Sequence, residues 1–418
     1  MPRTPKKAAE KLPPVAHEVL DHFGPAMGMS MADIDAATRR LKKALMERML
    51  GGELSHHLGY PPGTEKPDDA SNHRNGTSSK TVVTDNGPVA IAVPRDRAGT
   101  FEPVLVPKHA RRLPGFDDKV LALYARGLPT REIQKFVAEI YGIEVSPTLI
   151  SEVTDAVLEE VTAWQTRPLE PMYPVVFFDA LRVKIRDEGV VRSKAVYLAL
   201  AILADGSRDI LGIWIEHTEG AKFWMKVFTD LKTRGCDDIL IAVTDGLKGM
   251  PEALEAIYPA TTLQTCLVHL IRNSLELAGW KDRKALARAL RDIYTAPTAE
   301  VAAAELDAFA AGPWGRRFPT IVKMWRAAWT QVIPFFAFPP DVRRVIYTTN
   351  ILESVHARIR KVIKTRGHFP SDEAATKLIW LALRHITASW TTKAARHWRE
   401  TVHQFAILYE GRFLRELA

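Results

Sequence analysis

The sequence predicts an α/β protein of several domains, in which a mixed β-sheet lies between two mainly helical regions. Strand-like runs of apolar residues alternate with amphipathic helices over about residues 173–266. The residues before and after this stretch mostly follow a helical spacing instead. The length of 418 residues suits two or three domains at roughly 100–200 residues each.

The order of the predicted elements between 172 and 268 reduces the number of α/β folds that fit the sequence. Three strands joined by hairpins come first, and a helix, a strand, a second helix and a fifth strand follow. The predicted strands are 175–185, 195–203, 210–215, 239–243 and 262–266, and the predicted helices are 219–233 and 250–258. This order is typical of a ribonuclease-H-like mixed sheet, although many α/β folds also alternate strands and helices.

The N-terminal region is predicted in two parts. Residues 1–76 contain a basic tail, a helical segment at 30–58 and a linker rich in Gly and Pro. Residues 77–165 contain a strand pair about the turn Asp85-Asn86-Gly87 and then short helices, with Thr130 and Ser146 at N-cap positions. The short helices suit a DNA-binding helix-turn-helix, or equally a plain three-helix packing unit.

The charge of the chain favours a polyanionic partner, although weakly. Lys and Arg total 57 against 49 Asp and Glu, a net charge of +8. A local cluster is more informative: residues 356–366 contain five basic side chains and no acid. These are Arg358, Arg360, Lys361, Lys364 and Arg366.

Cysteine content and hydropathy indicate the compartment. The two cysteines, Cys236 and Cys266, are too few for a disulfide framework and fit a reducing cytoplasm. We expect no signal peptide and no membrane span, because no run of about 18 apolar residues occurs. The expected location is therefore the cytoplasm.

Three carboxylates form a candidate metal site. Asp179 lies inside the apolar strand VVFFDALRV, Asp245 ends the fourth strand, and Glu353 begins a helix 108 residues later. A buried charge costs several kcal/mol unless it is paired or binds a metal. The first and fourth strands are neighbours in the predicted sheet, so the carboxylates could meet. Such an oxygen-rich pocket suits two Mg²⁺ or Mn²⁺ ions and phosphodiester chemistry.

Each carboxylate also has a simpler interpretation. Asp179 could pair with Arg182 or Lys184. Asp245 could cap the following turn or helix. Glu353 completes a capping-box pattern that starts at Asn350.

Four blocks of sequence carry a resemblance to a known family. They are TTNILESVHARIRKVIKTRGHFP (348–370), VTDGLKGMPEAL (243–254), TLQTCLVHLIRN (262–273) and PRDRAGTFEP (94–103). With these blocks in this order, the chain resembles the Mutator-type bacterial insertion-sequence transposases over nearly its whole length.

The resemblance implies an enzyme with a DDE triad at Asp179, Asp245 and Glu353. It would bind the terminal inverted repeats of its element and catalyse metal-dependent DNA cleavage and strand transfer. The resemblance also implies that residues 269–344 form an α-helical insertion domain, and that residues 345–418 contain the last catalytic helix and further C-terminal helices. The partners expected are DNA and, because two DNA ends must be paired, a second copy of the chain, with 30–58 as a candidate interface. No membrane or small-molecule substrate is expected.

The alternatives are a catalytically silent DNA-binding repressor derived from a transposase and a nuclease acting on RNA–DNA hybrids. The long insertion and the N-terminal helices argue against the hybrid nuclease.

Further residues are assigned supporting roles. Glu353, His356 and Arg360 have offsets of 0, +3 and +7, so one helical stripe would meet the metals and the DNA phosphates. The resemblance implies the basic residue at Arg360 and the pair Cys266 and His269. This pair is expected to support the pocket, because zinc normally needs four ligands.

Trp325, with Trp314 and Trp329, could stack on an unpaired base or pack in the core. The DNA-binding candidates are His356, Arg358, Arg360, Lys361, Lys364, Arg366 and Trp325.

Overall fold

The computed structural model describes residues 30–68, 70–84, 87–141, 143–347, 350–390 and 398–413. The chain divides into two compact units, 30–122 with 130–150, and 123–129 with the residues from 151 onward, and each is described by itself. The predicted basic tail at the N-terminus and the turn residues Asp85 and Asn86 lie outside the described residues.

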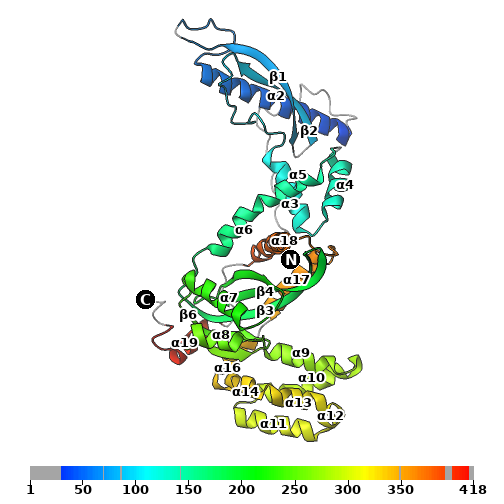
Figure 1. Cartoon of the computed structure of the whole chain (residues 1–418), viewed down its shortest axis with the longest axis vertical. Coiled ribbons are helices and arrows are strands. Elements are labelled where there is room, and N and C mark those ends of the chain that lie inside the picture. The colour runs from blue at the N-terminus through cyan, green and yellow to red at the C-terminus, as the bar shows by residue number, and fades with distance from the viewer. Residues whose placement is uncertain are drawn as a thin grey trace, which may run out of the picture. The chain divides into compact units, whose positions relative to one another are not determined.

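The first unit is built from a long helix and a two-stranded sheet. Helix α2 (Met31–Leu58) starts with a capping box at Ser30 and packs on the antiparallel strands β1 (Arg74–Thr84) and β2 (Gly87–Asp96) (Figure 1). The buried side chains between them include Leu50, Val82 and Ile91. The predicted strand pair is therefore confirmed, with its first strand starting earlier, at Arg74.

Short helices follow the strand pair, as predicted. They are α3 (Pro114–Ala125), α4 (Thr130–Tyr141), α5 (Pro147–Asp155) and α6 (Val157–Thr166). The hydroxyl of Ser146 accepts a hydrogen bond from the backbone N–H of Leu149 at 3.0 Å, which confirms the predicted N-cap.

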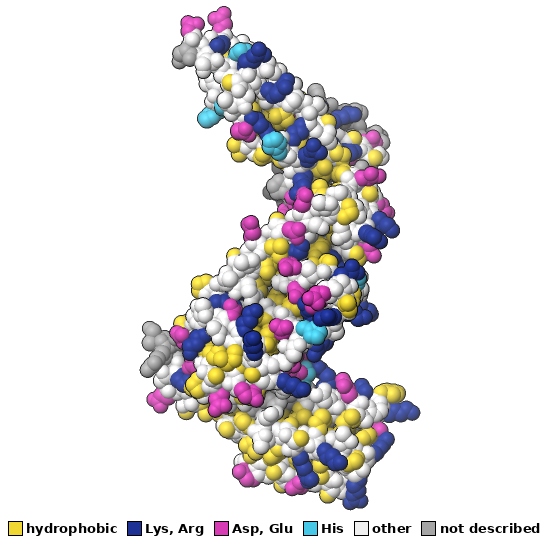
Figure 2. Space-filling model, in the orientation of Figure 1, with side chains coloured by type: hydrophobic (Ala, Val, Ile, Leu, Met, Phe, Trp, Pro, Cys, Tyr) yellow, Lys and Arg dark blue, Asp and Glu magenta, His cyan; other side chains and the backbone are white. Residues whose placement is uncertain are grey.

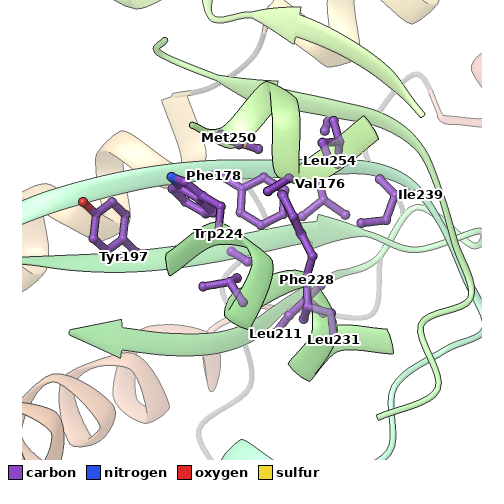
Figure 3. Close-up of a cluster of buried hydrophobic side chains, with 14 of the residues drawn as sticks. Val176, Phe178, Tyr197, Leu211, Trp224, Phe228, Leu231, Ile239, Met250 and Leu254 are labelled. Carbon is purple, nitrogen blue, oxygen red and sulfur yellow. The ribbon is translucent and has the colours of Figure 1, made fainter. Parts of the chain in front are cut away.

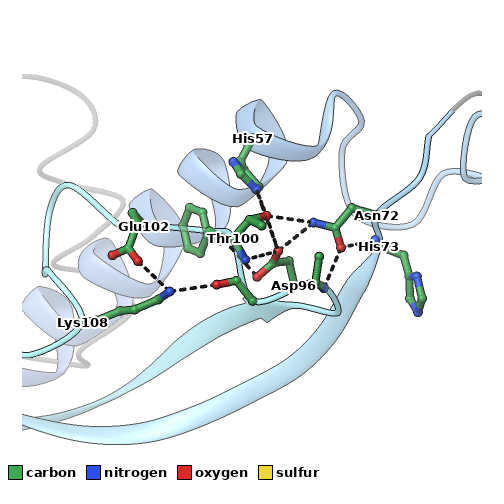
Figure 4. A network of polar contacts seen from close by, with 10 residues as sticks. His57, Asn72, His73, Asp96, Thr100, Glu102 and Lys108 are labelled. Carbon is green, nitrogen blue, oxygen red and sulfur yellow. Dashed lines mark hydrogen bonds and ion pairs between the residues drawn. The ribbon is translucent and has the colours of Figure 1, made fainter.

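Asp96 organises the loop that contains the PRDRAGTFEP block (Figure 4). Its buried carboxylate accepts hydrogen bonds from the Asn72 amide (2.7 Å) and from the backbone N–H groups of Thr100 (2.9 Å) and Phe101 (3.2 Å). Burial opposes ionisation, but these hydrogen bonds hold the pKa of Asp96 far below its ordinary value. In the block 94–103, Asp96 therefore has a structural role, because it holds the loop that follows β2 in place.

Replacing Asp96 with Ala is expected to destabilise the first unit by about 2–3 kcal/mol near neutral pH, because several hydrogen-bond donors lose a buried, charged acceptor. A lowered folded-state pKa contributes stability that is present above the unfolded pKa, about 3.9, and is lost as the pH falls below it. The wild type should therefore lose this contribution in acid, and the variant should not. Hydrogen exchange of peptides spanning 92–103 measures both effects.

The control is Glu102→Gln, which removes an exposed ion pair with Lys108 (2.7 Å) seen in the same view. Exposed pairs contribute little, so protection should stay within about 1 kcal/mol of wild type. Equal losses in the two variants would contradict the role of Asp96.

The second unit contains a five-stranded mixed sheet in the order β5-β4-β3-β6-β7. β3 pairs antiparallel with β4, which pairs antiparallel with β5, whereas β6 runs parallel to both β3 and β7. The prediction that the first and fourth strands of this sheet are neighbours is therefore confirmed. The strands are β3 (Met172–Asp187), β4 (Val190–Ile202), β5 (Arg208–Glu216), β6 (Asp238–Thr244) and β7 (Thr262–Thr265).

Two helices cover one face of this sheet. Helices α7 (Ala221–Thr233) and α8 (Met250–Ile257) bury Trp224 and Phe228 against Phe178 of β3 (Figure 3). The Phe178 ring meets the Trp224 ring edge to face, with centroids 5.8 Å apart. Because side chains alternate along a strand, Asp179 points to the opposite face from Phe178.

The opposite face is covered by helices from the C-terminal part of the chain. Helix α17 (Asn350–Ile363) contacts β3, and α18 (Asp372–Thr387) contacts β5 and α6. A further helix, α19 (Trp398–Leu408), is followed by Arg412, which forms two hydrogen bonds to the Asp238 carboxylate (2.6 and 2.8 Å). The break predicted near 367–370 lies between α17 and α18.

Residues 267–347 are helical, with no strand among the described residues, as predicted for 269–344. Figure 1 shows these helices as one group beside the sheet. No helix in the described part of the chain is long and apolar enough to cross a membrane. The helices are α9 (Leu267–Glu276), α10 (Trp280–Thr295), α11 (Ala299–Ala311), α12 (Pro313–Arg317), α13 (Pro319–Ala327), α14 (Trp329–Val332), α15 (Pro334–Ala337) and α16 (Pro340–Tyr347).

Candidate active site

The pairing of β3 with β6 brings two aspartates together. Phe178 and Thr244 are register partners on these parallel strands, so the next residues, Asp179 and Asp245, are neighbours. Ligand atoms of Asp179, Asp245 and His269 all lie within 4.8 Å of one another. Asp179 is buried and Asp245 is exposed, so the group opens to solvent on one side.

Two histidines contact the Asp179 carboxylate. Its Oδ2 lies 3.1 Å from Nδ1 of His356 and 3.8 Å from Nε2 of His269. Its Oδ1 accepts a hydrogen bond from the backbone N–H of Ala180 (2.7 Å). The ion pairs of Asp179 are thus with histidines rather than with Arg182 or Lys184.

The electrostatics of the two aspartates differ. Burial opposes the ionisation of Asp179, but the hydrogen bond from His356 and the charges of both histidines hold its pKa below the ordinary value. Desolvation and then the negative charge of Asp179 raise the pKa of Asp245. Two crowded carboxylates of this kind provide oxygen ligands that suit Mg²⁺ or Mn²⁺.

His269 lies at the start of α9, directly after β7. A hydrogen bond with Cys266 raises the pKa of His269 to about 9; burial opposes this shift, and Cys266, Asp179 and Asp245 add to it electrostatically. A charge on this imidazole favours ionisation of both carboxylates.

The two cysteines cannot share a metal. Cys236 precedes β6 and Cys266 follows β7, which is parallel to β6, so the thiols lie beyond opposite ends of the sheet. At about 3.3 Å per residue, the seven residues of β6 separate them by roughly 20 Å. This arrangement argues against structural zinc and favours the supporting role expected for Cys266.

Glu353 lies beside Asp179, but it is not part of the ligand group formed by Asp179, Asp245 and His269. It lines one small pocket together with Asp179, Cys266 and His269. Its carboxylate, however, forms an ion pair with Arg272 of α9. The side chain of its possible capping partner, Asn350, lies outside the described residues.

His356 and Arg366 differ from their predicted roles. His356 is 1% exposed and contacts Asp179, so its burial contradicts a DNA contact; it holds the aspartate instead. The guanidinium of Arg366 lies 4.3 Å from the centre of the Tyr124 ring, and its Nη2 donates to the carbonyl of Leu128 at 2.8 Å. Arg366 therefore fastens the end of α17 to the segment 124–128, and this engagement argues against a phosphate contact.

The other four basic residues of the cluster remain available to a polyanion. Arg358, Arg360, Lys361 and Lys364 are all exposed. The three-residue stripe proposed for α17 is thus divided, because His356 faces the sheet whereas Arg360 faces solvent.

Trp325 belongs to the core of the helical region. It is fully buried, and its Nε1 donates a hydrogen bond to Oγ of Ser274 at 2.9 Å. This burial contradicts stacking on DNA. Trp314 and Trp329 are half-buried against Phe318 and Phe336, respectively.

Two residues of the site were missed in the sequence. Arg272 lies in the TLQTCLVHLIRN block, which could have drawn attention to it. Glu219 precedes α7, where an acid is indistinguishable from an ordinary helix-start residue. Burial raises the pKa of Glu219, a hydrogen bond from the backbone N–H of Lys248 lowers it, and the charge of Asp245 raises it, which places Glu219 beside the loop of Asp245.

Known proteins resemble this chain along most of its length. Residues 18–393 match the model of the Mutator family of transposases. The transposase for insertion sequence element ISRM3 of Rhizobium meliloti (strain 1021) is 56% identical over 373 residues, covering 89% of this chain and 92% of the relative. A probable insertion-sequence transposase of Corynebacterium diphtheriae is 47% identical over 339 residues, covering 77% and 99%.

More distant relatives have the same kind of name. The transposase of IS256 in transposon Tn4001 of Staphylococcus aureus is 26% identical over 339 residues, covering 80% of this chain and 86% of the relative. The family match and the high identity to insertion-sequence transposases both extend through the sheet and the helices that contribute the candidate site. The chain therefore belongs to the Mutator family of transposases.

Proposed function

We propose that this transposase cleaves DNA at the ends of an insertion sequence and joins the strands to a target, with Asp179, Asp245 and Glu353 as its metal ligands. The observation that carries the proposal is the approach of Asp179 and Asp245 at one edge of the sheet, beside Glu353. The strand order and the C-terminal helix that brings Glu353 support a ribonuclease-H-like core, with residues 269–344 as its helical insertion.

Each side chain has a distinct part in this proposal. Two divalent ions, when bound, would supply activation of the attacking oxygen and stabilisation of the leaving oxygen. Asp179 and Asp245 would hold them, and His356 would keep the Asp179 carboxylate oriented from behind. Glu353 would exchange its partner Arg272 for the ions, which would leave the Arg272 guanidinium able to bind a DNA phosphate.

The direct test is a strand-cleavage assay with the full chain on DNA carrying the inverted repeat of the element. Cleavage and joining should require Mg²⁺ or Mn²⁺ and should stop in EDTA. Binding without nicking would favour the silent repressor. Preferential cleavage of an RNA–DNA hybrid would favour the nuclease.

Replacing His356 with Ala is expected to reduce activity by about 10–100-fold, because the partner of a metal-binding carboxylate orients it. The concentration of Mg²⁺ needed for half-maximal cleavage should rise, since the Asp179 carboxylate is no longer held. His368→Ala, which changes an exposed histidine in the loop that follows α17, is the control and should leave that concentration unchanged. Lost activity with an unchanged Mg²⁺ dependence would show that His356 only stabilises the fold.

The N-terminal region, residues 1–165, is expected to bind the inverted repeats without the catalytic part. Preference for repeat DNA over scrambled DNA should reach on the order of 10³-fold. Affinity should fall steeply with salt, because bound Lys and Arg displace counterions from phosphate. Electrophoretic mobility shifts at several salt concentrations measure both. Equal affinity for the two DNAs at moderate salt would contradict this recognition role.

A further inference from the structure

Another pocket lies in the helical region, residues 267–347, of the second unit. Its volume is about 900 Å³, within the range of sites that accept small organic groups. Helices α10, α15 and α16 and the loops beside them form its walls. The lining residues are Arg291, Tyr294, Thr295, Pro297, Phe335, Ala337, Phe338, Pro339, Pro340, Arg343, Arg344 and Tyr347.

Four of the twelve residues that line this pocket are aromatic. The rings of Tyr294 and Tyr347 are stacked, with centroids 5.3 Å apart and planes 19° apart. Both tyrosines are half-buried, so each keeps surface that a ligand can cover, whereas Phe335 and Phe338 are buried beneath the pocket. A flat ligand could therefore stack on the tyrosine pair.

The charge of the pocket is positive. Arg291 and Arg344 line it with exposed side chains. Arg344 forms an ion pair with Asp341 across an exposed contact of 3.5 Å, which competes weakly with a phosphate. No acidic side chain is among the described residues that line the pocket. An anionic ligand would meet no repulsion inside it.

The third arginine of the pocket, Arg343, binds backbone carbonyls of the pocket walls. Its guanidinium donates to the carbonyls of Phe336 (2.7 Å), Phe338 (2.6 Å), Ala296 (2.8 Å) and Pro297 (2.8 Å). These bonds join the loop after α10 to the segment around α15. The aromatic walls are thereby held in place before any ligand arrives, and this rigidity reduces the entropy lost on binding.

Elements that line this pocket contact elements that carry the candidate active site. Helix α15 packs against β7, and the residue after β7 is Cys266, which lines the pocket of Asp179 and Glu353. The Gln264 amide of β7 also donates to the carbonyl of Gln331 in α14 (3.3 Å). Tyr347 ends α16, six residues before Glu353. A DNA strand bound at the carboxylates would therefore lie near this pocket.

We infer that this pocket receives an unpaired nucleotide of the DNA strand next to the phosphate at which the enzyme acts. The base would stack on Tyr294 and Tyr347, and Arg291 and Arg344 would bind the phosphates beside it. The inference rests on the proposed function, because that function supplies the DNA strand. Extrusion of a base would also separate the strands at the point of cleavage.

The test compares two duplexes of the same element end. One is blunt, and the other has three unpaired nucleotides on the strand at the cleavage site. Fluorescence anisotropy in EDTA measures their binding to the full chain, so the result does not depend on catalysis. The wild type should bind the unpaired end about tenfold more tightly, as expected for stacking of one base.

The variant Tyr294→Leu/Arg344→Ala should lose this preference and keep its affinity for the blunt duplex within about twofold, which also checks that it is folded. The matched control is Phe318→Leu/Arg326→Ala. It changes a half-buried phenylalanine and an exposed arginine of the same region, both outside the pocket, and should retain the preference.

A base analogue gives an independent measurement. With 2-aminopurine in the unpaired segment, wild type and control should quench its fluorescence by stacking, and the pocket variant should not. Equal binding of both duplexes by the wild type, or a preference that survives in the pocket variant, would overturn the inference. Absence of cleavage by the wild type in Mg²⁺ would instead count against the proposed function and leave the binding result standing.

Discussion

Replacing Asp179 or Asp245 with Asn is expected to abolish DNA cleavage and strand transfer, with a loss of roughly 10³-fold or more. The amide keeps the size of the side chain but removes the charge that binds metal, and metal ions contribute several kcal/mol of transition-state stabilisation. The negative charge of Asp179 raises the pKa of Asp245, and a bound cation would offset this repulsion.

DNA binding by both variants should remain close to wild type, because affinity comes mainly from phosphate contacts elsewhere on the protein. Mobility shifts on repeat DNA and cleavage of the same DNA separate the two effects. Asp187→Asn is the matched control, since Asp187 lies at the end of the same strand and pairs with Lys194 (3.3 Å) at a partly exposed position. Near-normal Mg²⁺-dependent cleavage by either aspartate variant would remove that residue from the active site.

Replacing Glu353 with Gln is expected to reduce strand chemistry by about 100-fold or more, because a metal ligand should matter at least as much as the residues that orient one. Gln can still accept a hydrogen bond at a helix start, so the capping interpretation predicts an active variant. A pre-nicked DNA end provides the measurement, since it isolates strand joining from the first cleavage.

Arg272→Ala distinguishes the metal role of Glu353 from its ion pair. If Glu353 served only to hold Arg272, the two variants would have equal defects. If Glu353 binds metal, Arg272→Ala leaves the carboxylate free to do so and should remain more active than Glu353→Gln. An active Gln variant would exclude Glu353 from the metal site.

Variants of two exposed arginines of α17 test whether the position of a basic residue on the helix affects strand joining. Arg360→Ala should slow joining more than Arg358→Ala, because Arg360 lies seven residues, close to two turns, beyond Glu353 and therefore projects from nearly the same side of α17 as Glu353 does. Overall repeat binding should weaken only modestly in both, since each removes one phosphate contact among many. Equal losses of joining would mean that the basic residues of α17 act as a general DNA-binding surface. Figure 2 shows that Lys and Arg side chains are also spread over the visible face of the helical region.

Local patterns in the sequence were enough to predict the succession of strands and helices along the chain: apolar runs of strand length, turn residues between them, and helices of 3.6-residue period. From the sheet that typically has this succession, the sequence also predicted that the two aspartates could meet. Once β3 and β6 are known to be adjacent and parallel, Asp179 and Asp245 must lie close together, because each follows a register partner of the other strand.

Only the tertiary structure decided which partners the remaining side chains meet. The spacing of Glu353, His356 and Arg360 defines a stripe on α17, but packing against β3 directs His356 to Asp179 and leaves Arg360 in solvent. The choice of Arg272 as the partner of Glu353 depends on α9, 81 residues away in the chain. The sequence around Trp325 does not distinguish a stacking residue from a core residue. The packing of α13 against α9 buries it, and its N–H finds a partner in Ser274. Periodicity defines which residues share a face, whereas contacts between distant elements decide what that face touches.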